Sequence, residues 1–87
     1  MNITRYDGTR FITEEEIDRD FTGQWVLISL INLPNPWEGG YLVASADGRD
    51  EMYPELSDIA YYDFNNKAKI IYGCKTRGDS LHVQILG

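Results

Sequence analysis

The sequence predicts an α+β domain with a single, mainly antiparallel sheet of about four strands, arranged as two hairpins, and two helices packed on one face. Three observations predict this class. Two apolar runs, residues 24–33 and 41–46, flank a turn rich in proline and glycine. Segments 12–20 and 49–66 carry helix signals. The chain then closes with alternating apolar residues typical of strands. The expected order is α-β-β-α-β-β.

Length and composition restrict the class further. The chain has 87 residues, which suit a single domain over 1–87, and its 43% hydrophobic content is that of a globular protein. No run approaches the ~20 apolar residues of a membrane span. The first residues lack the apolar core of a signal peptide, so we expect a cytoplasmic protein with no membrane association.

The first helix has the strongest local signal. Thr13 and Glu16 have the spacing of a capping box, in which each side chain accepts a hydrogen bond from the other residue's backbone amide. Ile12 and Ile17 flank the cap as a hydrophobic staple. These signals predict a helix of about two turns over 12–20.

The central hairpin follows. Residues 24–33 are apolar in almost every place, which is typical of a strand covered on both faces. Pro34 ends this strand, and the connection 34–40 carries Trp37. Residues 41–46 then return as the second strand.

The second helix is expected over 49–66. Pro54 is tolerated only in a first turn, so the helix should begin between 51 and 54. Asn65 and Asn66 accept the left-handed conformation that ends helices. One apolar stripe should face the sheet: Met52, Leu56, Ile59 and Ala60. Strands at 68–75 and 80–86, joined by a turn at Gly78, complete the prediction.

Charge is unevenly distributed along the chain. The net charge is −6, but residues 1–63 hold thirteen acidic and four basic side chains, a balance of −9. This excess argues against direct nucleic-acid binding, because phosphate is repelled. The acidic-face candidates form two groups, one in each helix: Glu14, Glu15 and Asp18, then Asp50, Glu51, Glu55 and Asp58. If both groups share one surface, they would imitate a nucleic-acid backbone.

Aromatic residues are the candidates for an interface. Trp37 lies in a long loop, where it either folds back over the core or is exposed as an anchor. Tyr61 and Tyr62 are adjacent on the second helix, so they cannot both face the core.

Residues that could carry chemistry are few. Segment 18–23 resembles the opening of a calcium loop, but Ser29 occupies the place of the required glutamate. Cys74 is the only cysteine and is expected on a buried strand face, and His82 stands alone, so neither forms a catalytic or metal site. We therefore expect no enzyme activity, cofactor or metal.

These observations favour a protein that acts by binding another protein or a second copy of itself. The first alternative is an acidic, nucleic-acid-mimicking inhibitor of a nucleic-acid-binding protein, of the kind that mobile elements encode. The second is a small-ligand module with a pocket between helix and sheet. An enzyme that uses Cys74 or His82 is the third alternative.

Overall fold

The computed structural model describes residues 3–33 and 39–74. Two helices and five strands follow one another in these segments, in the order β1-β2-α1-β3-β4-α2-β5. Their bounds are β1 Ile3–Arg5, β2 Phe11–Ile12, α1 Glu14–Asp20, β3 Gln24–Ser29, β4 Gly40–Asp47, α2 Met52–Phe64 and β5 Ala68–Tyr72. The predicted class, α+β with a single antiparallel sheet, is confirmed, with one strand more than the four expected.

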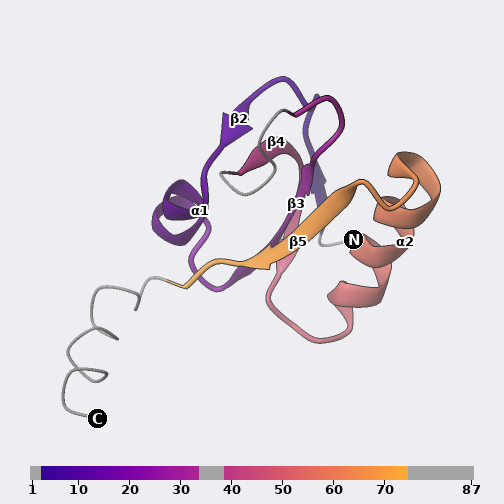
Figure 1. Ribbon diagram of the computed structural model, residues 1–87. Helices are drawn as coiled ribbons and strands as arrows, with labels where there is room; N and C mark the ends of the chain where they lie inside the picture. The colour runs from indigo at the N-terminus through magenta and orange to yellow at the C-terminus, as the bar shows by residue number, and fades with distance from the viewer. Residues whose placement is uncertain (1–2, 34–38, 75–87) are drawn as a thin grey trace, which may run out of the picture.

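The sheet has the strand order β1-β4-β3-β5, and β2 also pairs with β4. All pairings are antiparallel. The hairpin β3–β4 is therefore the centre of the sheet, as predicted. β4 and β5 both pair with β3, so they run parallel to each other. α2 connects β4 to β5 and crosses over β3 (Figure 1). The predicted strand at 80–86 and its turn lie outside the described residues.

A β-bulge shifts the register between β3 and β4 in the central hairpin. Leu27 pairs with Ala44, but Ile28 pairs with Leu42, so Val43 is the extra residue on β4. The Val43 carbonyl accepts a hydrogen bond of 2.8 Å from the amide of Tyr6, just beyond β1. The bulge therefore falls where the edge strand meets β4.

The two helices cover opposite faces of the sheet, and the expectation that both lie on one face is wrong (Figure 1). We call the core between the sheet and α2 the α2-side cluster: Leu27, Val43, Ala44, Ala46, Met52, Leu56 and Ala60. The core that includes α1 is the α1-side cluster: Ile12, Ile17, Val26, Ile28 and Leu42. Successive residues of β3 point to opposite faces, so this apolar strand supplies both clusters. The physical reason for the error is that a strand apolar on both sides needs cover on both sides.

Local sequence signals predicted the positions of both helices correctly. The Thr13 hydroxyl accepts from the Glu16 amide at 3.2 Å, and the Glu16 carboxylate accepts from the Thr13 amide at 3.0 Å, which confirms the capping box. α2 begins at Met52, within the predicted interval, and ends at Phe64, and its C-cap Asn65 has the left-handed φ of 51°.

Candidate functional site

The outer side of α2 carries three exposed tyrosines. Met52, Leu56 and Ala60 face the core, while the exposed fractions are 45% for Tyr53, 56% for Tyr61 and 76% for Tyr62. Tyr53 and Tyr61 are eight residues apart, a spacing that puts them on one flank, about 12 Å apart along the axis. The two candidates Tyr61 and Tyr62 are thus both directed outward.

These tyrosines make ordered ring contacts. Tyr61 and Tyr62 meet edge to face, with ring centroids 4.9 Å apart at 89°. Such pairs have a preferred geometry and hold large side chains in position at the surface. The two rings therefore present a partly fixed aromatic surface to solvent.

An aromatic cluster that sequence reasoning missed extends this surface beside the first turn of α2. We call it the tryptophan cluster: Trp25, Tyr53 and Tyr72. The Trp25 ring lies 5.2 Å from that of Tyr53 and 5.0 Å from that of Tyr72, both edge to face. Its indole Nε1 donates to the carbonyl of Arg49 at 3.0 Å, which fixes the loop before α2. Trp25 and Tyr72 are cross-strand partners, and only the register of β3 against β5 reveals this.

The acidic candidates before and within α2 are all exposed. Asp50 and Glu51 precede the helix, and Glu55 and Asp58 lie in its first half. Within the described residues, no basic side chain lies within 4.0 Å of these four carboxylates. Segment 50–66 holds five acidic residues and no basic one. The helix dipole favours the first three of them only, because its effect is confined to the first turn.

The acidic candidates of α1 have different surroundings. Glu14 forms an ion pair of 3.1 Å with Lys69 of β5, and Glu15 is exposed. Asp18 is 7% exposed, so it does not contribute to an acidic surface. Its Oδ1 accepts a hydrogen bond of 2.9 Å from the backbone amide of Cys74, which ties the segment just after β5 to α1. Because α1 and α2 lie on opposite sheet faces, the two acidic groups do not form one flat surface.

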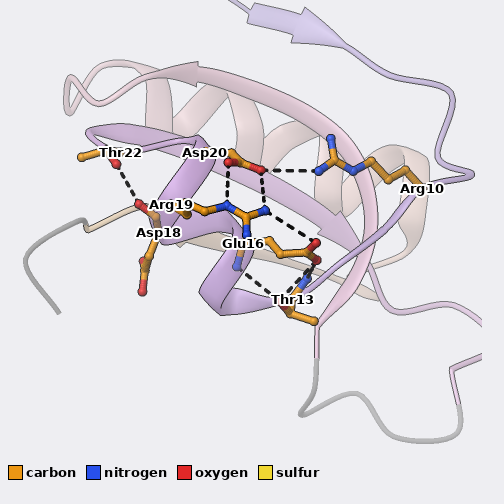
Figure 2. Close-up of polar contacts among 7 residues, drawn as sticks. All are labelled: Arg10, Thr13, Glu16, Asp18, Arg19, Asp20 and Thr22. Atoms are coloured by element: carbon orange, nitrogen blue, oxygen red, sulfur yellow. Dashed lines mark hydrogen bonds and ion pairs between the residues drawn. The ribbon is translucent and has the colours of Figure 1, made fainter. Parts of the chain in front are cut away.

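Figure 2 shows the polar network around α1. Arg19 donates two hydrogen bonds to the Asp20 carboxylate, at 2.9 and 3.1 Å, and Arg10 lies 3.6 Å from it. The hydrogen bonds from Arg19 are the main cause that lowers the pKa of Asp20 below its ordinary value of 3.8. The same pairing raises the pKa of Arg19. The network links α1 to the segment before β2 and is structural.

A groove lies between β1 and α2, on the flank of the helix away from the tryptophan cluster. Ile3 and Ile59 are half-buried in its wall, and Arg5, Glu55 and Asp58 form its rim. Its volume is about 370 Å³. The groove lies between helix and sheet, where the small-ligand alternative places its pocket, but Arg5, Glu55 and Asp58 leave it open to solvent.

Residues that could serve in metal or nucleophile chemistry can be placed only in the described part of the chain. Within residues 3–33 and 39–74, no three His, Cys, Asp or Glu residues are grouped to hold a metal ion. Cys74 is exposed, which corrects the expectation that it is buried: β5 ends at Tyr72, so Cys74 lies beyond the strand. The candidates Trp37 and His82 lie outside the described residues.

Comparisons with known proteins identify no family and no function for this surface. No protein-family model matches the chain, and neither curated proteins nor solved structures gave a match. Neither described helix is long and apolar enough to cross a membrane. Function therefore has to be argued from the surfaces themselves.

Proposed function

We propose that the protein acts by binding another protein through the outer side of α2. The observation that carries this proposal is the exposure of Tyr53, Tyr61 and Tyr62 on one helix. Tyrosine combines a large apolar ring with a polar hydroxyl and few rotatable bonds, and it is enriched where interfaces gain most of their binding energy. Exposed aromatic residues gathered on one element are a feature of interaction sites.

The charge of α2 indicates the chemistry of the partner. The same helix and the loop before it carry Asp50, Glu51, Glu55 and Asp58, and no basic side chain among the described residues lies within 4.0 Å of these four carboxylates. Complementary charge speeds association and selects the partner, so the proposed partner presents a basic surface. A second copy of the chain fits less well. A two-fold contact through α2 would bring the acidic residues of both copies together.

The acidic-mimic alternative has less support than protein binding through tyrosines. It requires the acidic groups of both helices on one surface, whereas the helices cover opposite faces of the sheet. A mimic would also depend on charge more than on aromatic rings, so its binding would weaken steeply with salt. This difference separates the two in one experiment.

The experiment is capture of partners on the immobilised full chain, with elution in salt steps, followed by measurement of Kd with the purified partner. The test variant is the double change Tyr61→Gln and Tyr62→Gln. The control is Phe11→Gln, which removes an aromatic residue of 41% exposure from β2. Circular dichroism and urea unfolding check that both variants fold.

We expect the tyrosine variant to weaken binding by about 30-fold, the effect of losing about 2 kcal/mol at an interface hot spot. The Phe11 control should bind as the native chain does. A partner that the tyrosine change leaves unaffected and moderate salt releases would contradict the proposal and favour the acidic mimic. Concentration-dependent dimerisation that is lost in the tyrosine variant would assign the surface to self-association.

A further inference from the structure

The groove between β1 and α2 combines an apolar wall with a negatively charged rim. Ile3 and Ile59 are half-buried and supply the wall, and both pack at the margin of the α2-side cluster. Glu55 and Asp58 supply exposed carboxylates from α2. A ligand that fits both features needs an apolar stem and a cationic end.

Among the residues that the structure describes, neither of the two rim carboxylates has a counterion within 4.0 Å. Glu55 and Asp58 are three residues apart on α2, so they are neighbours on the helix surface, where like charges are mutually unfavourable. Arg5 is on the rim too, but its guanidinium lies 3.5 Å from the carboxylate of Asp63, which offsets its charge. No ion pair within the described residues joins Glu55 or Asp58 to a basic group. A bound cation would relieve their repulsion.

We infer that this groove receives an arginine or lysine side chain of the partner protein. The inference rests on the proposed function and deepens it by naming the residue type that the partner contributes. The aliphatic stem of that side chain lies along Ile3 and Ile59, and its charged end lies between the carboxylates of Glu55 and Asp58. A guanidinium suits this place best, because its planar set of donors can bond two carboxylates at once.

A side chain of a protein fits the groove better than a free small cation. The volume of about 370 Å³ is at the lower end of the range for ligand pockets. Three of the five lining residues are exposed, so a free molecule would remain largely in water. A side chain on a docked partner is already held close, so its binding loses less translational and rotational freedom.

The test is a two-dimensional NMR titration of the ¹⁵N-labelled full chain with acetyl-Ala-Ala-Arg-Ala-Ala-amide. The matched peptide carries citrulline in place of arginine, which keeps the shape and removes the charge. Butylguanidinium serves as the free small cation. The test variant is Glu55→Gln with Asp58→Asn. The control variant is Glu15→Gln with Asp50→Asn, which removes the same charge outside the groove.

We expect saturable shifts at the amides of Ile3, Glu55, Asp58 and Ile59, with the arginine peptide bound about tenfold tighter than the citrulline peptide. The groove variant should lose this difference, and the control variant should keep it. Equal binding of both peptides, shifts that do not saturate, or an unaffected groove variant would overturn the inference. Butylguanidinium bound more tightly than the arginine peptide would also overturn it, because the groove would then suit a small organic cation better than the side chain of a protein.

The two proposals fail separately. Loss of partner capture in the tyrosine variant, together with no arginine preference in the groove, refutes the groove inference and leaves the proposed function standing. A specific arginine preference in the groove, with a captured partner that ignores the tyrosine change, supports the groove chemistry and refutes the role of Tyr61 and Tyr62.

Discussion

Leu56→Ala and Ile17→Val should destabilise the protein independently of each other, because the two side chains belong to cores on opposite faces of the sheet. Both are fully buried, Leu56 in the α2-side cluster and Ile17 in the α1-side cluster. Packed layers lie roughly 10 Å apart, so the sheet separates the two sites by more than the distance at which mutational effects couple. Leu56→Ala with Val43→Ala is the matched comparison, since these two residues share one cluster.

The expected magnitudes follow from complete burial. Leu56→Ala should lower the free energy of unfolding by about 2–5 kcal/mol, and Ile17→Val by about 0.5–1.5 kcal/mol. A domain of 87 residues has a total stability of about 4–13 kcal/mol. The Leu56→Ala change therefore removes a large part of it, and the smaller change at Ile17 keeps the double variant measurable.

Urea unfolding of the native chain, the single variants and the two double variants gives the two coupling energies. We expect a coupling energy below about 0.5 kcal/mol for Ile17 with Leu56, and about 0.5–3 kcal/mol for Val43 with Leu56. A large coupling between Ile17 and Leu56 would refute the separation of the cores. Additivity of Val43 and Leu56 would refute their shared packing.

Three further predictions concern α1 and its contacts. Thr13→Ala removes the N-cap and should lower the free energy of unfolding by about 1 kcal/mol in urea, and no change would mean that the capping box does not form in solution. Gly73→Ala places a methyl group against the backbone carbonyl of Phe21, so the end of β5 must move away from α1. We expect a loss of about 1–3 kcal/mol by the same assay, and a neutral result would show that the two segments are not in contact. Arg19→Gln should raise the pKa of Asp20 toward 3.8, followed by NMR titration of the carboxyl carbon. Because folding depresses this pKa, the stabilisation is present above pH 3.8 and is lost as the pH falls through the folded-state value. An unshifted titration of Asp20 would contradict the pairing.

Structural features that depend on a few neighbouring residues could be predicted from the sequence. The Thr13 and Glu16 pair, the position of Pro54 and the left-handed Asn65 each depend on local backbone geometry, and the structure has all three as expected. The central hairpin could also be predicted, because its two apolar runs flank a segment rich in proline and glycine.

Features that depend on pairing between distant segments of the chain could not be predicted in this way. The position of β1 and β2 beside β4 cannot be derived from their short, irregular sequences. The placement of the helices is a different case. The pattern of β3 already indicated burial on both faces, and with two helices available the natural arrangement is one on each side. The expectation of one-sided packing did not follow from that pattern.

The candidate site was predictable in part for the same reason. Adjacency on a helix was enough to direct Tyr61 or Tyr62 outward, and the structure exposes both. The tryptophan cluster joins three separate elements through strand register, which no local pattern specifies. Asp18 looks like a surface carboxylate in the sequence, but its partner is the amide of Cys74, 56 residues away.

The stability of the helix alone does not explain the amino-acid composition of α2. Its N-cap, Glu51, makes no side-chain capping bond, its last turn has no basic residue, and Glu55 and Asp58 repel each other. α1, by contrast, has a full capping box and an arginine in its last turn. Both helices pack on the same sheet, so the demands of folding alone would favour similar devices in each. The difference is accounted for if α1 is shaped by stability and the outer side of α2 by a partner, because charges and rings that do little for the free protein contribute once a basic surface covers them.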